Sequence, residues 1–315
     1  MIKTINAALL STILLSTTNA LPVSAASTTA DAPARVENPV IPSSVTFAGQ
    51  KVSLDDIDMF ERYDRELTSL AFTHGNTLLT IKRANKYFPV LAPILKRNGI
   101  PQDLLYLACI ESTLNPVAVS GAKAAGLWQF MPATARDFGL EVNDDVDERF
   151  DIEKATEAAC RYLRQAYEKY GNWESVAASY NGGQGRISRE LAAQGVESAY
   201  DLYLTSETSR YMFRLLAMKE IMEHPQRYGY HLHKRQLYQP VKYDVVEVDS
   251  TVTSWPQWAL EQGIDFLTLK EHNPWIRSRQ LPNPKRKTYS VLIPTPESRR
   301  RSTGSRDVFN HNWTK

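Results

Sequence analysis

Apolar side chains recur at intervals of three and four residues between residues 54 and 98. An α-helix has about 3.6 residues per turn, so side chains at such intervals share one face. The spacing predicts a helical segment over residues 42–98, whose apolar faces pack on the domain that follows. The positions that carry the period are Ile57, Phe60, Tyr63, Leu67, Leu78, Ile81, Ala84 and Tyr87.

Residues 99–228 continue the helical period, but Gly, Asn and Pro interrupt it repeatedly. One helix is expected to begin near Pro101, because proline suits the first helical position. A second begins after Asp151, a suitable N-cap, and ends at Gly171. A third opens near Ser206. Because almost none of this stretch alternates like a strand, the domain is predicted to be mainly α-helical.

The pattern changes in residues 237–296. Apolar and polar positions alternate over residues 241–245 and again over 289–293, which predicts two β-strands. Two short helical stretches, over residues 255–262 and 265–272, lie between them. The order of these elements predicts a small β-α-α-β unit.

The first residues have the pattern of an export signal. Lys3 is followed by a short apolar run over residues 7–15 and then by small residues. The run is well below the roughly 20 residues of a membrane span, so we predict a cleaved signal peptide over residues 1–26. Residues 27–41, rich in Ala, Pro and Thr, are expected to form a flexible leader. Since no cysteine lies near the cleavage region, we expect an exported protein, periplasmic or associated with the cell envelope, without a lipidation cysteine.

Composition and charge exclude some classes of protein. The 315 residues are 43% hydrophobic, which is typical of a soluble globular protein. They include 37 Lys and Arg against 35 Asp and Glu, and this near balance argues against a nucleic-acid partner. The six histidines form no set with suitably spaced Cys or Glu, so neither a metal nor a cofactor is expected. The tail over residues 297–315 is basic, has few apolar residues and is predicted to be disordered.

Cys109 and Cys160 are the only cysteines. Export would permit a disulfide between them. Both also lie at half-apolar helical positions, where a free thiol packs as a small hydrophobic side chain. The sequence leaves both alternatives open.

Three motifs in the helical domain carry candidate chemistry, and the first contains Glu111. At helical spacing Glu111 shares a face with Leu104, Leu107 and Ala108, so desolvation should raise its pKa. Its place in the last turn acts in the same direction, because the helix C-terminus carries partial negative charge. Both effects suit a general acid near neutral pH. The alternative is a glutamate that simply extends into solvent at the helix end.

The other two motifs are a loop and a helix end. Residues 126–132 (Gly-Leu-Trp-Gln-Phe-Met-Pro) combine aromatic rings with an amide, as sugar-binding clefts do, although the rings could equally fill the core. In residues 179–183 (Ser-Tyr-Asn-Gly-Gly), the glycines permit a turn with positive φ that fixes Tyr180 and Asn181 at its edge. A plain helix C-cap would explain Asn181 and the glycines alone.

The order and spacing of these motifs resemble the catalytic domain of lytic murein transglycosylases of the soluble-lytic-transglycosylase type. This is a lysozyme-like domain of glycoside hydrolase family 23. The matching pieces are Glu-Ser-Thr-Leu-Asn-Pro at 111–116, the loop 126–132, residues 179–183 and the helix that carries Tyr211. The Leu-Trp-Gln-Phe-Met form, with the acidic stretch 146–151, is most similar to the D-type membrane-bound enzymes. The resemblance implies a mainly α, lysozyme-like fold for residues 99–228.

The resemblance also implies a reaction. Such enzymes cleave the β-1,4 bond between N-acetylmuramic acid and N-acetylglucosamine and form 1,6-anhydro-N-acetylmuramic acid, in cell-wall remodelling or turnover. Glu111 would be the catalytic acid and then the base. The resemblance implies seven substrate-binding residues. Ser112 would orient the acid or the substrate, and Gln129, Phe130 and Met131 would line sugar subsites. Tyr180 and Asn181 would lie at the acetamido region, and Tyr211 would reach toward Glu111.

Residues 241–294 resemble a degenerate LysM module, a unit that binds N-acetylglucosamine-containing glycans. Asp249-Ser250-Thr251 stands where Gly-Asp-Thr is usual, so the unit could bind glycan or serve only as a structural cap. The expected partner is the peptidoglycan glycan strand, with peripheral association with the envelope; protein partners are not predicted. Two alternative functions stay open: a water-using muramidase, which needs a second catalytic group, and a catalytically silent peptidoglycan-binding protein.

Overall fold

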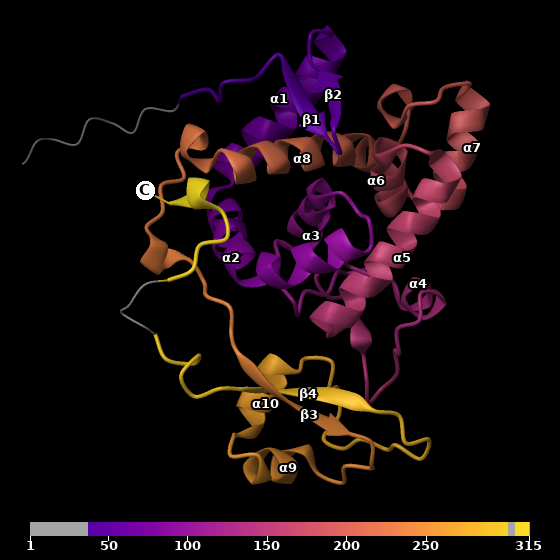
Figure 1. Ribbon diagram of the computed structural model, residues 1–315. Helices are drawn as coiled ribbons and strands as arrows, with labels where there is room; N and C mark the ends of the chain where they lie inside the picture. The colour runs from indigo at the N-terminus through magenta and orange to yellow at the C-terminus, as the bar shows by residue number, and fades with distance from the viewer. Residues whose placement is uncertain (1–36, 302–305, 315) are drawn as a thin grey trace, which may run out of the picture. The chain divides into compact units, whose positions relative to one another are not determined.

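The structure is a computed structural model that describes residues 37–301 and 306–314. The predicted signal peptide and most of the predicted leader therefore lie outside the described residues. Residues 38–315 form one compact unit in which helices predominate, so the predicted mainly α fold class is confirmed (Figure 1). Among the described helices, none combines the length and apolar character needed to cross a membrane.

A β-hairpin opens this unit, where the sequence had predicted only helix over residues 42–98. Strands β1 (Ser44–Phe47) and β2 (Gln50–Ser53) pair antiparallel, and Ala48 and Gly49, both with positive φ, form the turn. Each strand has four residues, too few to establish a period of two in the sequence. The hairpin precedes α1 (Ile57–Phe72) and α2 (His74–Arg97), which carry the predicted helical period.

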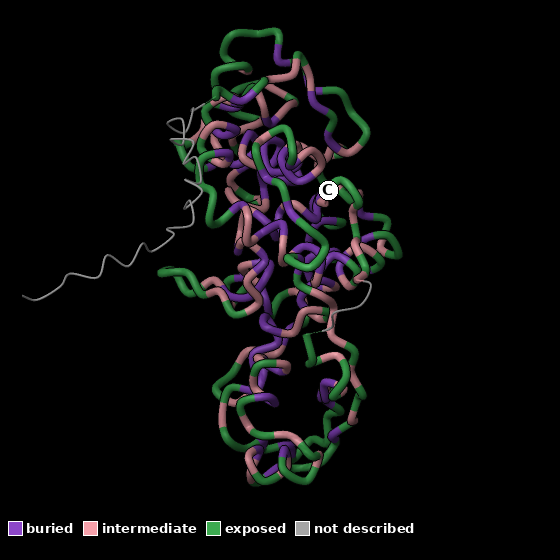
Figure 2. The backbone as a smooth tube through the Cα atoms, turned by 90° about the vertical axis from the view of Figure 1, so that its left-hand side faces the viewer, coloured by how far each residue is buried: buried purple, intermediate pink, exposed green. Residues whose placement is uncertain are grey.

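The helical domain that follows is built around α3, which contacts α2 on one side and α8 on another (Figure 1). Buried positions gather along the middle of this domain (Figure 2). Helix α5 begins after the N-cap Asp151 and ends at Gly171, which adopts the left-handed conformation, as predicted. The helices of this domain are α3 (Leu105–Ser112), α4 (Pro132–Asp137), α5 (Ile152–Tyr170), α6 (Trp173–Gly182), α7 (Gln184–Gln194) and α8 (Ser206–Glu223).

Cys109 on α3 and Cys160 on α5 are both buried and both free. Of the two alternatives for these cysteines, the structure has the one without a disulfide, in which each thiol packs in the apolar core. Burial raises the pKa of both thiols, which keeps them protonated and unreactive.

The C-terminal unit has the predicted β-α-α-β order. Its two strands pair antiparallel, with Tyr243 opposite Pro294 and Val248 opposite Tyr289. A separate core, which includes Trp255, fills the space between the sheet and the two helices. The elements are β3 (Tyr243–Val248), α9 (Trp255–Glu261), α10 (Phe266–His272) and β4 (Tyr289–Pro294).

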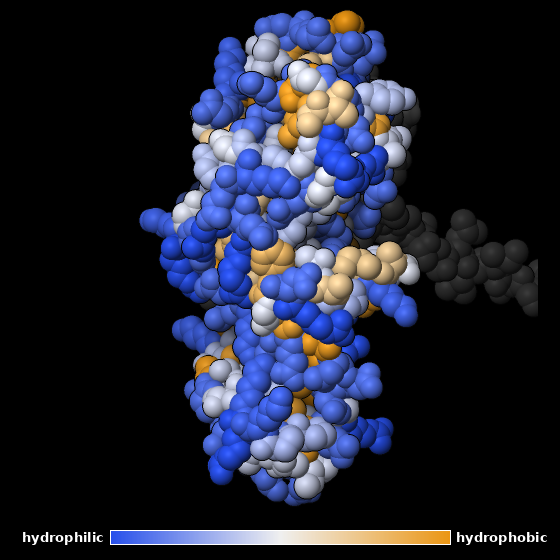
Figure 3. Space-filling model, turned by 90° about the vertical axis from the view of Figure 1, so that its right-hand side faces the viewer, coloured by the Kyte–Doolittle hydropathy of each residue, from blue (hydrophilic) through white to orange (hydrophobic). Residues whose placement is uncertain are grey.

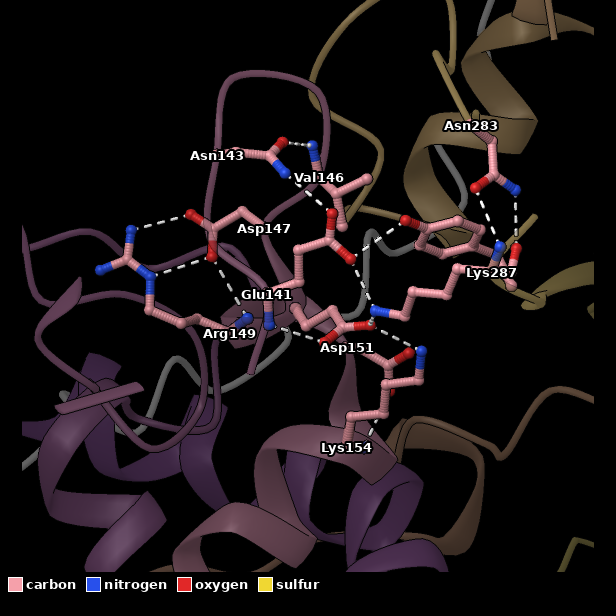
Figure 4. A network of polar contacts seen from close by, with 11 residues as sticks. Glu141, Asn143, Val146, Asp147, Arg149, Asp151, Lys154, Asn283 and Lys287 are labelled. Atoms are coloured by element: carbon pink, nitrogen blue, oxygen red, sulfur yellow. Dashed lines mark hydrogen bonds and ion pairs between the residues drawn. The ribbon is translucent and has the colours of Figure 1, made fainter. Parts of the chain in front are cut away.

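The C-terminal unit is joined to the helical domain by the loop that precedes α5. Val146 pairs with Ile276 in a β-bridge, and Ala125, Val146 and Phe150 belong to the core of the C-terminal unit. Ion pairs of Lys287 with Glu141 and with Glu148 add to this contact (Figure 4). The acidic stretch 141–151 is therefore part of the contact between the helical domain and the C-terminal unit.

The prediction of a disordered tail over residues 297–315 is wrong for residues 306–314. Trp313 is only 1% exposed, and its indole N–H donates a hydrogen bond to the Met222 carbonyl at 2.6 Å. Phe309 packs edge-on against Phe88 with ring centroids 5.5 Å apart. The buried ring of Trp313 holds this polar segment on the core. Asn85 adds two hydrogen bonds, donating to the Asp307 carbonyl and accepting from the Phe309 N–H.

The face that includes α4, α5 and α7 is largely hydrophilic, with small separate apolar patches (Figure 3). The short 3₁₀ helices complete the description: η1 (Gln102–Leu104), η2 (Glu148–Phe150), η3 (Ala199–Asp201), η4 (Pro225–Tyr228), η5 (Lys234–Gln236) and η6 (His311–Trp313).

Candidate active site

Glu111 lies in the last turn of α3, where the chain leaves the helix abruptly. Thr113 and Leu114 both have positive φ, of 51° and 54°, which is uncommon for residues other than glycine. Arg83 of α2 holds this turn by donating hydrogen bonds to the carbonyl and hydroxyl oxygens of Thr113 at 3.0 and 3.2 Å. Such strained positions persist only when the surroundings enforce them, and they cluster at functional sites.

The Glu111 carboxyl faces α8. The Tyr211 hydroxyl donates a hydrogen bond to Glu111 Oε1 at 2.6 Å, although 100 residues separate the two in sequence. Desolvation by burial raises the pKa of Glu111 to about 7, and the Tyr211 hydrogen bond and the Arg214 charge only partly oppose this. Near neutral pH the group is therefore present in both protonation states, as a group that first donates and then accepts a proton requires.

Glu207 is the carboxylate whose charge acts on Glu111, raising its pKa further. It lies on α8, one turn before Tyr211, and is exposed. The sequence motifs gave no reason to single it out, because it belongs to none of them. Its effect on Glu111 makes it the candidate for a second acidic group of the site.

Tyr180 lies beside Glu111 and Tyr211, but its hydroxyl forms a hydrogen bond with a different segment. Its hydroxyl donates to the Trp128 carbonyl at 2.7 Å and so ties α6 to the loop 126–132. Burial, with the neighbouring charge of Glu111, raises the pKa of both Tyr180 and Tyr211 well above the usual value. Both phenols thus remain protonated and can act as hydrogen-bond donors.

The loop 126–132 directs its large rings inward. Trp128 is fully buried and donates from its indole N–H to Thr156 at 2.9 Å. Phe130 is 4% exposed, so the expectation that it lines a sugar subsite is wrong: its ring fills the core beside Tyr180. Met131, at 44% exposed, is the side chain of this loop that reaches the surface.

Gln129 and Ser112 hold the loop in place. Gln129 has a φ of 49°, and its amide donates to the carbonyls of Ala118 and Gly126 at 3.2 and 2.8 Å. Ser112 is buried, and its hydroxyl lies 3.0 and 2.9 Å from the carbonyls of Ala108 and Leu127. Ser112 therefore fixes the end of α3 against the loop and does not present its hydroxyl to a substrate.

Asn181, the remaining predicted site residue, lies in the last turn of α6 and is partly exposed. The turn after it depends on glycine, since Gly183 has a φ of 80°. Among the described residues, the Asn181 side chain has no hydrogen-bond partner. Its amide is free to meet a ligand.

A buried ion pair supports the loop from behind. Asp147 binds Arg149 through two hydrogen bonds, of 2.9 and 2.8 Å, and Arg149 also donates to the Phe130 carbonyl at 3.0 Å (Figure 4). A side chain at Gly126 would collide with the Arg149 carbonyl, so only glycine fits there.

Glu66 is a residue that sequence reasoning missed. It lies on α1, is 1% exposed and forms ion pairs with Arg65, Arg210 and Arg214. Arg210 and Arg214 flank Tyr211 on α8. The available signal was a glutamate between Tyr63 and Leu67 on the apolar face of a predicted helix.

The C-terminal unit has a cavity of its own. A hollow of about 320 Å³ lies between the loop that contains Asp249-Ser250-Thr251 and α9, and Gln257 and Trp258 line it. Hydroxyl, amide and indole groups of this kind suit a sugar.

Comparison with known families matches both parts of the chain. Residues 90–202 match the transglycosylase SLT domain. The chain carries an SLT transglycosylase domain. Residues 244–297 match the soluble lytic transglycosylase C-terminal LysM-like domain, so both predicted resemblances are confirmed.

Individual relatives agree with this. Membrane-bound lytic murein transglycosylase D of Escherichia coli (strain K12) is 33% identical over 177 residues, which make up 55% of this chain and 38% of the relative. A putative tributyltin chloride resistance protein of Alteromonas sp. is 30% identical over 117 residues, 37% of this chain and 56% of that protein. The chain thus spans well under two thirds of the length of these relatives.

Among solved structures, the crystal structure of the 70 kDa soluble lytic transglycosylase from Escherichia coli is 25% identical. The similarity covers 44% of this chain and 24% of that one, with a TM-score of 0.39.

Proposed function

We propose that this chain is a peptidoglycan lytic transglycosylase that cleaves the β-1,4 bond between N-acetylmuramic acid and N-acetylglucosamine. The observation that carries the proposal is Glu111, a buried carboxyl with a pKa of about 7 that accepts a hydrogen bond from Tyr211 within an SLT domain. The names of the relatives support the same substrate.

In this mechanism Glu111 acts twice. Protonated Glu111 gives its proton to the glycosidic oxygen as the bond from C1 of N-acetylmuramic acid to that oxygen breaks. The substrate's acetamido group stabilises the developing positive charge. The Glu111 carboxylate then takes the proton of the C6 hydroxyl as O6 bonds to C1. Water is not consumed, so the product is a 1,6-anhydro sugar.

Tyr211 and Asn181 would assist this sequence in different ways. The Tyr211 hydroxyl fixes the orientation of the carboxyl and stabilises its ionised form between the two proton transfers. Asn181, whose amide is free among the described residues, would hold the acetamido group. Gln129 and Met131 would lie along the sugar subsites.

A hydrolytic muramidase is the second candidate, and Glu207 is the observation in its favour. Ordinary glycosidases use two carboxyl groups, roughly 5–9.5 Å apart. Glu207 is exposed and its charge acts on Glu111, so it could activate a water molecule. A catalytically silent binding protein would have no use for the raised pKa of Glu111.

Mass spectrometry of muropeptides released from purified peptidoglycan sacculi tests the proposal. We expect products with 1,6-anhydro ends, one water lighter than hydrolysis products, and no products from Glu111→Gln. Glu168→Gln, which changes an exposed glutamate of α5, is the matched control and should retain activity. Reducing ends that disappear in Glu207→Gln would establish the hydrolase, and a folded wild-type chain that releases nothing would establish the binding protein.

We also propose that the chain acts in the cell envelope as an exported, periplasmic protein associated only peripherally with membranes. The predicted signal peptide and the names of the membrane-bound relatives support this. Cell fractionation with N-terminal sequencing tests it: the chain should begin after residue 20 to 26 and be released with the periplasmic contents. An intact N-terminus in the cytoplasmic fraction would contradict it.

A further inference from the structure

A groove of about 1260 Å³ lies outside the candidate active site. One wall is α2, and the other is formed by the segment 235–242, which leads into β3, and the segment 295–300, which follows β4. Neither the proposed proton transfers nor the contacts between the two domains use it.

Cations dominate its lining. Six lysines and arginines of the lining, which the last sentence of this paragraph names, form no ion pair with a carboxylate of the described residues. The charge of Glu271 acts on one of them, Lys86. Like charges gathered in a concave, partly buried site repel one another, and burial lowers the pKa of Lys86. The arrangement favours an anionic ligand. The six are Lys82, Lys86, Arg235, Lys242, Arg299 and Arg300.

Two carboxylates in the same lining narrow the range of ligands that fit the groove. Glu297 and Asp307 add negative charge among the cations. A peptide with both carboxylate and ammonium groups would complement both signs, whereas a purely anionic polymer or an anionic phospholipid surface would complement only the cations. The concave form also suits a chain segment better than a flat membrane.

The groove shares two residues with the motif that contains Glu111. Asn115 and Pro116, at the end of the motif that starts with Glu111, are part of its lining. Arg83 lines it too, while donating to the Thr113 carbonyl at 3.0 Å. The short segment 111–116 thus connects the candidate catalytic residue with the lining of the groove.

We propose that this groove binds the peptide stem of peptidoglycan, with the carboxylates of the stem paired to the lysines and arginines of the lining. The choice of ligand rests on the proposed function, because N-acetylmuramic acid carries such a stem. Guanidinium groups bind carboxylates through two parallel hydrogen bonds, which gives specificity as well as charge. The chain would thus select strands that still carry peptides.

Binding by the full chain in the inactive Glu111→Gln background tests this, because it does not depend on cleavage. The probes are soluble glycan strands with their peptide stems and the same strands stripped of stems by an amidase. The groove variant reverses three exposed cations of the lining, and a matched control reverses three exposed cations elsewhere. The groove variant is Arg235→Glu, Lys242→Glu and Arg299→Glu, and the control is Lys51→Glu, Lys96→Glu and Lys285→Glu.

We expect the groove variant to lose at least about tenfold in affinity for stem-bearing strands, the equivalent of 1.4 kcal/mol, while the control loses less than twofold. Stripped strands should bind both variants equally, and added salt should weaken only the stem-dependent part. Equal loss on both kinds of strand would overturn the proposal, as would a selective loss of binding to anionic lipid vesicles or to inorganic polyphosphate. Failure of the active chain to cleave either strand would refute the proposed function instead, since the binding difference is measured separately.

Discussion

Two glutamates, Glu66 buried and Glu111 partly buried, face helix α8 from different helices, and their chemistry diverges. Glu66 on α1 and Glu111 on α3 both lose solvation, and burial is the largest influence on the pKa of each. Three arginines surround Glu66 and lower its pKa overall. Glu111 has one phenol and a more distant arginine, and its pKa rises to about 7.

The difference shows how one helix can serve structure and chemistry together. Arg210 and Arg214 neutralise Glu66, and Tyr211 between them in sequence reaches Glu111. An ion pair satisfies a buried carboxylate and keeps it ionised, whereas a single neutral donor leaves it able to exchange a proton. The residue type is the same, and the partners decide its role.

The largest expected effect comes from replacing Glu111, the glutamate of this comparison that can exchange a proton. Glu111→Gln should lower the rate of strand cleavage by about 10²–10⁴-fold, the usual contribution of general acid–base catalysis. The measurement is the initial rate of muropeptide release at pH 6. Activity within tenfold of wild type would show that Glu111 is not the catalytic acid.

The same variant should be more stable than wild type at alkaline pH. With a pKa near 4.5 in the unfolded chain and about 7 in the folded one, Glu111 binds more protons when folded, so stability falls as pH rises between these values. Glutamine has no such dependence, and the gain at pH 8 could reach about 3 kcal/mol. Urea unfolding should give equal stabilities near pH 4 and a gap that opens by pH 8; a gap independent of pH would contradict the raised pKa.

The second variant replaces Glu66, the ion-paired glutamate. Glu66→Gln should lower the free energy of unfolding by about 1–3 kcal/mol at pH 7, because three arginines lose their shared carboxylate. The pKa of Glu66 is lowered in the folded chain, so its stabilisation is present above the unfolded value and is lost as pH falls through the folded one. The difference from wild type should therefore shrink as the pH falls below about 4.5.

Glu61→Gln is the control for this experiment, since Glu61 is exposed on the same helix. It should change stability by less than about 0.5 kcal/mol. If both variants lose the same amount, the arginine cluster does not distinguish Glu66 from a surface glutamate.

The sequence predicts one member of this comparison and not the other. Glu111 belongs to a motif, and its apolar helix face already indicates a raised pKa. Its hydrogen bond with Tyr211 was expected only from the resemblance, because no local pattern shows that residues 100 apart will meet. Glu66 has no motif, and its partners depend on how α1 packs on α8.

In other parts of the chain, predictions from neighbouring residues succeed where a feature is local and fail where it depends on a distant segment. Asp151 and Gly171 define α5 because caps act within a few residues. The inward turn of Trp128 and the docking of Trp313 could not be predicted, since each depends on a distant partner, Thr156 in one case and Met222 in the other. Contacts between distant segments, not helix formation, are what the sequence leaves open.

A third variant tests the account of Glu111 by removing the one side chain that donates a hydrogen bond to it among the described residues. Tyr211→Phe deletes a hydrogen bond that favours the ionised carboxylate, so the pKa of Glu111 should rise, by about one unit for a bond of 1–1.5 kcal/mol. The descending limb of the pH–rate profile should move to higher pH by that amount, with a lower maximum rate. An unchanged limb would mean that the hydrogen bond does not set the pKa.

The smallest expected effect tests whether lysines can do for a buried glutamate what arginines do for Glu66. Glu148 is buried and bonded by Lys154 at 2.7 Å and by Lys287 of the C-terminal unit at 3.0 Å, and its pKa is lowered. Lys287→Gln leaves Lys154 in place, so unfolding free energy should fall by no more than about 1 kcal/mol, the range of partly exposed ion pairs. Lys285→Gln, two residues away and without a partner among the described residues, should have no effect. A loss well above 1 kcal/mol in Lys287→Gln would mean that the two lysines act as one unit and that the C-terminal unit contributes directly to holding the loop beneath the active site.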